Sequence, residues 1–387
     1  MADSDDTDVA VIGGGVVGCA VAHALARRGV RVTVLEAEPG LALGASGANS
    51  GILHTGFDSP PGELETRLIL RAGALRDELL DELAVTVWRC GARLAPRDGQ
   101  ERETVAALAA NAHANGVDAQ LAADGTLSVP GESVTDPVAF VHALAGAAQG
   151  AGARIALGAR VDAIRQLRGG GLELGVQNGE PLRAKAAVNC AGLHADDVGA
   201  LAGERPLEVY PRKGEFLVFR VTEPLTEILL PVPSALGKGV LVFPSLDGHV
   251  IAGPTARERE DKDDWSVEAD ARELILSRAA RMFPALALAE PVGAYAGLRP
   301  AGRGANYLIE PARTVPGLIH VAAIRSTGLS ASLAIGEHVV ALLAAHAGVR
   351  LGPVRSLPAP PDQAPRGPWW ERAATHHAGR RGARAST

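Results

Sequence analysis

The feature that most constrains this chain is a glycine-rich turn between two apolar runs near its N-terminus. Residues 8–12 (DVAVI) have the pattern of a short buried parallel strand, and the turn GGGVVG at 13–18 follows directly. A helical pattern then extends to residue 28, and residues 31–35 (RVTVL) form a second apolar run. Strand, G-x-G-x-x-G turn, helix and strand in this order predict a β-α-β unit that binds a dinucleotide.

The glycines of this turn have separate expected roles. Gly13 permits the tight turn, Gly15 lets a pyrophosphate approach the backbone, and Gly18 lets the helix pack close to the strand. The N-terminus of the helix adds free N–H groups and a partial positive charge. Glu36 ends the second strand, 18 residues after Gly18, where an acid can accept hydrogen bonds from an adenosine ribose. The alternative reading of Glu36 is a solvated acid at a strand end.

Composition excludes several classes of protein. The chain has 387 residues, of which 47% are hydrophobic, so it is neither disordered nor fibrous. A net charge of −6 argues against nucleic acid as a partner. The three cysteines, Cys19, Cys90 and Cys190, are too sparse to predict a disulfide framework or a metal site. We find no run of about 18 apolar residues and no secretory-signal pattern, so we expect no transmembrane segment and a cytoplasmic location.

Four stretches in order carry a resemblance to a known family. They are the β-α-β unit; GASGANSGILHTG at 44–56; AVNCAGLHADDVGALAG at 187–203; and GLIHVAAIRSTGLSASLAIGEHVV at 317–340, which AGLRPAG at 296–302 precedes. Together they resemble the D-amino-acid-oxidase-type FAD-dependent oxidoreductases. The resemblance implies FAD as the cofactor and an oxidation in which hydride passes from a substrate carbon to flavin N5.

Shorter motifs indicate a branch of that family. NSGILHTG, PRKGEF at 211–216 and GPTA at 253–256 are similar to the branch that oxidises 2-hydroxy acids or glycerol 3-phosphate, and among the first kind they look most like L-2-hydroxyglutarate dehydrogenase/oxidase. The segment IRSTGLSAS is similar to glycerol-3-phosphate-dehydrogenase-like members. The main expectation is oxidation of a small, 2-hydroxyglutarate-like 2-hydroxy acid. The alternatives are a glycerol-3-phosphate-type dehydrogenase, an amino-acid or amine oxidase, and a flavin-binding protein without turnover. The substrate would be a small carboxylate or phosphate, with the electron acceptor (oxygen, a quinone or a protein) left open.

The resemblance and the patterning together predict an α/β fold with two interleaved domains. We expect a discontinuous, Rossmann-like FAD-binding domain from residues 1–82, 137–205 and 297–350. An antiparallel-sheet substrate domain would comprise residues 83–136 and 206–296.

The motifs also nominate residues for the flavin site. Residues 44–51 are small, which lets backbone lie close to a flat ring, and Ser326-Thr327-Gly328 precede the last long helix, whose positive end would stabilise a reduced flavin. Simple N-capping by Ser326 or Thr327 is the alternative. The predicted cofactor residues are Gly13, Gly15, Gly18, Glu36, Ser46, Asn49, Ser50, Ala191, Gly192, Arg325, Ser326, Thr327, Gly328 and Leu329.

Three further residues are candidates for binding and converting the substrate. By the resemblance, Arg299 clamps a substrate carboxylate, since a guanidinium fork matches it with two parallel hydrogen bonds; a surface arginine is the alternative. Lys213 is preferred over its neighbour Arg212 as a second cation that binds the substrate. The alternative is that both residues lie on a solvated strand edge. His54 is a general base, a point of covalent flavin attachment, or a residue packed on the ring. Arg325 would serve either the ring or the substrate.

The Pro- and Arg-rich segment 351–387 is expected to form a tail outside the core. Trp369-Trp370 and the arginines after them could touch a membrane surface or an electron-accepting partner. We favour a disordered tail or docking on the parent domain.

Overall fold

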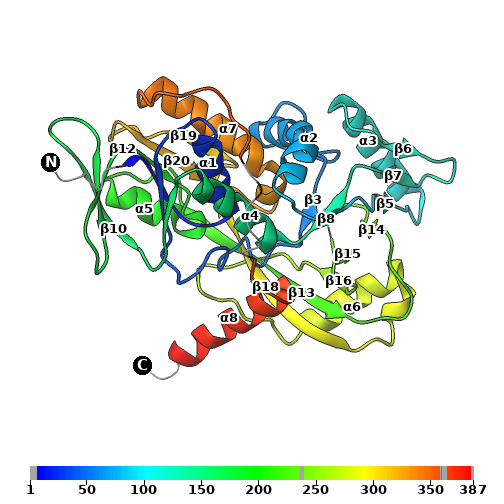
Figure 1. Ribbon diagram of the computed structural model, residues 1–387. Helices are drawn as coiled ribbons and strands as arrows, with labels where there is room; N and C mark the ends of the chain where they lie inside the picture. The colour runs from blue at the N-terminus through cyan, green and yellow to red at the C-terminus, as the bar shows by residue number, and fades with distance from the viewer. Residues whose placement is uncertain (1–6, 235–238, 358, 360–363, 385–387) are drawn as a thin grey trace.

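The computed structural model describes residues 7–234, 239–357, 359 and 364–384 (Figure 1). Its first elements are β1 (Thr7–Ile12), α1 (Val16–Ala26) and β2 (Val32–Leu35), and β1 pairs with β2 in parallel. The predicted β-α-β unit is therefore confirmed.

The unit belongs to an eight-stranded sheet. The strands β9, β2, β1, β12 and β20 lie side by side in parallel, while β10, β11 and β19 join them antiparallel. The further bounds are β9 (Arg154–Ala156), β10 (Val161–Gln166), β11 (Leu172–Val176), β12 (Leu182–Asn189), β19 (Leu308–Pro311) and β20 (Leu318–Ala322). The parallel strands point their carboxyl ends to one edge, which is where ligands bind in such sheets.

Alternating residues of β1 separate the two faces of this sheet. Val9 and Val11 join the cluster that α1 shares with α4 (Pro137–Gly150), α7 (Gly328–His346) and α2 (Leu64–Glu82). Ala10 and Ile12 join a smaller cluster with α5 (Ala195–Leu201) and β10–β12. Among the described residues, α7 alone is long and apolar enough to cross a bilayer, and most of it is buried against α1 and α2, as in a core helix.

A nine-stranded, mainly antiparallel sheet forms the other half. Its longest pairing joins β13 (Val209–Phe219) to β18 (Pro291–Gly302) near one edge of the sheet, and α6 (Ala271–Met282) packs on β13 and β16. Its remaining strands are β5 (Ala92–Leu94), β6 (Gln120–Leu121), β7 (Leu127–Val129), β14 (Ile228–Leu229), β15 (Leu241–Pro244), β16 (Val250–Gly253) and β17 (Arg257–Glu258). The expected combination of a Rossmann-like unit with an antiparallel sheet is confirmed; the domain boundaries stay predictions.

The remaining elements complete the chain between and beyond the two sheets. β3 (Ile52–Leu53), β8 (Ser133–Thr135) and β4 (Val87–Trp88) form a small sheet, and α3 (Gly99–Ala114) lies in the lobe of β5–β7 at one end of the molecule (Figure 1). Short 3₁₀ turns span Gly192–His194 and Pro284–Leu286.

The expectation of a tail outside the core does not hold for the helical part of the C-terminal segment. Residues Trp369–Arg384 form α8, which begins beside β18 and contacts it there (Figure 1). Trp369 and Trp370 are 3% and 5% exposed, because two indole rings have a large apolar area to bury. Docking on the parent chain, one of the two readings favoured for these tryptophans, is what the structure shows.

Candidate functional site

One cavity of about 920 Å³ lies between the two sheets. It begins at the carboxyl ends of β1, β2, β12 and β20 and continues to β13 and β18. Of the residues predicted to hold the cofactor, all but Gly18 line it. Segments far apart in sequence, residues 44–50, 190–192 and 325–329, thus meet around one space large enough for a dinucleotide and a small substrate.

The glycine turn has the shape of a phosphate cradle. Gly13 has φ +112°, and a Cβ there would lie 2.4 Å from the Cys190 carbonyl oxygen. A Cβ on Gly18 would lie 1.9 Å from the Gly13 oxygen, so Gly18 serves helix packing and not the cavity wall. Gly15 lines the cavity at the N-terminus of α1, whose first turn has no acid and no side-chain cap. Backbone and helix dipole there suit a pyrophosphate.

Glu36 lies at the end of β2 and lines the same cavity. Its carboxylate accepts hydrogen bonds from the backbone N–H groups of Gly14 and Glu38. Burial raises the pKa of Glu36, and these two hydrogen bonds oppose that shift. The acid therefore shapes the glycine turn, and its predicted contact with a ribose is compatible with this position.

The turn before α7 presents the positive end of a long helix to the cavity. Residues 326–329 line the cavity, and the first turn of α7 contains no acid. Thr327 is the N-cap residue but makes no capping hydrogen bond; its hydroxyl donates to Glu65 Oε1 at 2.6 Å and lies 2.9 Å from the Tyr307 hydroxyl. Side-chain capping by Thr327 is therefore absent, and the helix end suits the negative charge of a reduced flavin.

His54 and Glu132 form a hydrogen-bonded pair at the cavity wall. His54 Nδ1 lies 2.8 Å from Glu132 Oε2, and Glu132 is fully buried. The other carboxylate oxygen accepts from the Thr55 backbone N–H at 2.7 Å and its hydroxyl at 2.8 Å. An ionised carboxylate only accepts, so Nδ1 holds the proton and Nε2 keeps a lone pair. This is the tautomer that a general base requires.

Two facing arginines supply positive charge to the cavity where it is lined by β13 and β18. Arg212 on β13 is paired directly with Arg299 on β18, and both line the cavity. Within the described part of the chain neither has a carboxylate partner, and Arg212 Nε is buried without a hydrogen bond. Arg299 donates only to backbone oxygens, those of Thr255 at 2.7 Å and Lys213 at 3.4 Å. Like charges directly opposite each other on a sheet destabilise it, so this pair is well suited to bind an anion.

The pKa of Arg299 reflects the same environment. Burial lowers the pKa of Arg299 to about 10, and the positive charges of Arg212 and Arg325 act in the same direction. Arg325 also lines the cavity but has a partner, Glu65 Oε2, at 3.5 Å. The uncompensated charge therefore lies mainly on Arg212 and Arg299.

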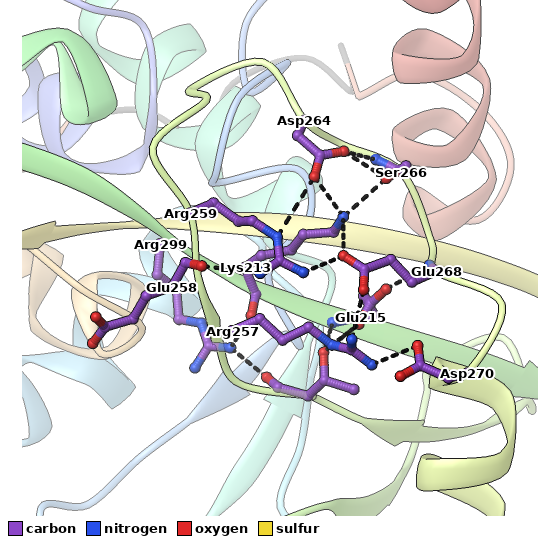
Figure 2. A network of polar contacts seen from close by, with 11 residues as sticks. Lys213, Glu215, Arg257, Glu258, Arg259, Asp264, Ser266, Glu268, Asp270 and Arg299 are labelled. Atoms are coloured by element: carbon purple, nitrogen blue, oxygen red, sulfur yellow. Dashed lines mark hydrogen bonds and ion pairs between the residues drawn. The ribbon is translucent and has the colours of Figure 1, made fainter.

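The choice of Lys213 as the second cation was wrong. Successive residues of a strand point to opposite faces, so Lys213 points away from the face that Arg212 and Arg299 share. Its amine is fully buried and bonds Asp264 at 2.9 Å, Ser266 at 2.9 Å and Glu268 at 3.3 Å (Figure 2). Lys213 thus ties β13 to the segment before α6, and Arg212 takes its place at the cavity.

Comparisons with known proteins agree with this geometry. The family model described as FAD dependent oxidoreductase (DAO) matches residues 8–342. Glycerol 3-phosphate dehydrogenase of Caloramator mitchellensis is 31% identical over 354 residues, covering 87% of this chain and 73% of that protein. L-2-hydroxyglutarate dehydrogenase of Escherichia coli (strain K12) is 28% identical over 286 residues, covering 67% of each chain.

A solved structure shows the same fold with cofactor. Dithionite-reduced L-alpha-glycerophosphate oxidase from Mycoplasma pneumoniae with FAD bound has a TM-score of 0.85 and 27% identity, covering 92% of this chain and 99% of that chain. The glycine cradle, the two helix N-termini and the cavity that joins them fit FAD. The chain is therefore a member of the DAO family of FAD-dependent oxidoreductases.

Proposed function

We propose that the chain oxidises the secondary hydroxyl of glycerol 3-phosphate, or of a closely similar phosphorylated alcohol, to a ketone. The observation that carries this proposal is the uncompensated pair Arg212 and Arg299 at one end of the cavity. A phosphate monoester carries close to two negative charges and offers several oxygens, which match two guanidinium groups better than they match one. The relatives named for glycerol 3-phosphate support the same choice.

The chemistry divides between the two ends of the cavity. FAD, when bound, supplies the hydride acceptor. His54 Nε2 removes the hydroxyl proton, and the buried Glu132 carboxylate, 2.8 Å from Nδ1, stabilises the imidazolium that results. Arg212 and Arg299 hold the phosphate, which fixes the distance between the reacting carbon and the flavin.

A 2-hydroxyglutarate-like dicarboxylate is the second candidate. The sequence motifs favoured it as the main reading, and a second carboxylate would also require a second cation. The relative named for it is less similar and covers less of the chain than the glycerol 3-phosphate dehydrogenase does. An amino-acid oxidase needs one carboxylate clamp, so an amino acid would leave one of the two arginines without a partner.

Replacement of Arg212 tests the phosphate assignment. Arg212→Gln should lower kcat/KM for glycerol 3-phosphate by about 10- to 150-fold, the loss expected from one charge-assisted contact. Neutral glycerol lacks the phosphate, so its slower oxidation should change only a few-fold. Arg272→Gln is the matched control, because Arg272 lies exposed on α6 and pairs with Glu290. Equal losses with both substrates would contradict the assignment.

A further inference from the structure

We propose that α8 is a latch that holds the cofactor-side loop of residues 41–50 against the nine-stranded sheet, and that Trp369 and His377 are its positioning residues. The helix lies outside residues 8–342, the part that matches the family model. All of the motifs predicted for the cofactor lie inside that part. The latch is therefore an addition to a cofactor site whose motifs all lie elsewhere in the chain. We expect it to control the rate at which FAD is released.

The first contact of the latch is a hydrogen bond to the 41–50 loop. Trp369 is 3% exposed, and its indole Nε1 donates to the Asn49 carbonyl oxygen at 3.1 Å. The Asn49 side chain in turn donates to the Ser326 carbonyl oxygen at 3.3 Å, in the turn before α7. Trp369 therefore contacts one cavity-lining turn directly and is connected to the other through the Asn49 side chain.

Packing along the loop reinforces this hydrogen bond. One narrow cavity of about 40 Å³ remains between the loop and α8, room for no more than a few waters. It is lined on one side by Leu41, Ala42, Leu43, Gly44 and Gly47, and on the other by Trp369, Arg372, Ala373, His376 and His377. Three of these loop residues, Ala42, Leu43 and Gly44, also line the main cavity on their other side.

The latch is anchored on the opposite sheet. Trp370 donates from Nε1 to Asp247 Oδ2 at 3.2 Å and lies over Gly293 of β18, where an added Cβ would come within 2.4 Å of its ring. The His377 ring stacks on Trp265, with centroids 3.7 Å apart and an interplanar angle of 2°. Trp265 is a wall residue of the main cavity.

Trp265 is itself held by the polar network of Figure 2. Its neighbours Asp264 and Ser266 bond the buried Lys213 amine, and Glu268 bonds both Lys213 and Arg259. The segment that carries Trp265 is therefore fixed to β13. Through the stack with His377, α8 connects this fixed segment to the 41–50 loop.

The test measures FAD release from the purified holoenzyme as the rise of flavin fluorescence after dilution. Trp369→Phe keeps an aromatic ring but removes the N–H donor and part of the buried ring area, so release should become at least about 3- to 10-fold faster, the effect expected of losing one neutral hydrogen bond. His377→Ala removes the stack on Trp265 and should act in the same direction. Both variants act without a substrate, so this test is independent of the proposed function.

Two controls separate the latch from a general loss of stability. Trp88→Phe changes a tryptophan on β4 that does not line the main cavity, and Thr375→Ala changes an exposed residue of α8. Both should release FAD at the parent rate. If Trp369→Phe and His377→Ala also release FAD at the parent rate, with or without a lower melting temperature, α8 is only a structural addition and the proposal is overturned.

Discussion

The Glu132 carboxylate should decide whether His54 is able to act as a base, and Glu132→Gln isolates that role. The amide has the size of the carboxylate, so the buried site is not emptied. In the parent, Oε1 accepts two hydrogen bonds from Thr55 and Oε2 accepts one from His54 Nδ1. The amide oxygen satisfies Thr55, so the NH₂ group faces His54.

That exchange inverts the tautomer of the histidine. An NH₂ group donates to Nδ1, which moves the imidazole proton to Nε2 and removes the lone pair that faces the cavity. It also removes the negative charge that stabilises the imidazolium. General-base catalysis contributes roughly 10²- to 10⁴-fold to rate, and the corresponding Asp→Asn exchange in serine proteases costs about 10⁴-fold. We expect flavin reduction at saturating substrate to slow within that range.

The assay is anaerobic stopped-flow reduction of the bound flavin. His54→Ala should slow the same step by a similar factor, and the double variant should be little worse than either single one, because the pair acts as a unit. Thr55→Val is the control, since it removes one hydroxyl from Glu132 Oε1 but keeps the backbone donor. Reduction of Glu132→Gln within a few-fold of the parent rate would refute the reasoning.

Three other substitutions have defined outcomes. Arg299→Ala should lower kcat/KM by about 10- to 150-fold and Arg299→Lys should restore little of it, because an ammonium lacks the planar fork; steady-state kinetics with glycerol 3-phosphate would reveal either failure. Gly15→Val places a branched side chain in the cradle, where a Cβ already lies 3.0 Å from Ser46 Oγ, so the protein should purify folded by circular dichroism but without flavin absorbance; a full complement of FAD would reject the cradle. Burial lowers the pKa of His23 to about 4. Below about pH 6.5, His23 therefore binds a proton in the unfolded state but stays neutral in the folded state until the pH approaches 4. Stability should fall between pH 7 and 5, and His23→Gln should remove about 2 kcal/mol of that fall in urea unfolding; an unchanged pH dependence would exclude His23 as its source.

The parts of the fold that follow from local patterns could be predicted from the sequence. The β-α-β unit was recognised because a glycine turn, an apolar strand and a helical period are all local signals. The N-terminus of α4 carries a local signal of the same kind: Asp136 accepts hydrogen bonds from the backbone N–H groups of Val138 and Ala139, and Pro137 occupies the first turn.

Strand β13 shows where local reasoning failed. Pro211 and Gly214 are residue types that favour a break in a strand, yet one strand spans Val209–Phe219. Its long pairing with β18 overrides these two residues. Without that continuous strand the alternation of side chains was not visible, and Lys213 was preferred to Arg212.

Glu132 and α8 were missed for a different reason. Glu132 is 78 residues from His54 in sequence and belongs to no motif, so only the fold brings the two together. The prolines and arginines of the C-terminal segment are typical of a solvated linker. Burial of Trp369 and Trp370 where α8 contacts β18 nevertheless holds part of this segment on the rest of the protein. The positions of Glu132 and of α8 both depend on contacts between segments that are distant in sequence, and local sequence patterns do not reveal such contacts.

Anaerobic reduction of the bound flavin by alternative substrates tests the central claim most directly. The purified yellow protein is mixed with glycerol 3-phosphate, 2-hydroxyglutarate or a set of amino acids, and bleaching of the flavin band is followed. A site built on Arg212, Arg299 and His54 for a phosphorylated alcohol predicts rapid bleaching by glycerol 3-phosphate and slow or no bleaching by the others. Faster bleaching by 2-hydroxyglutarate or by an amino acid would contradict it.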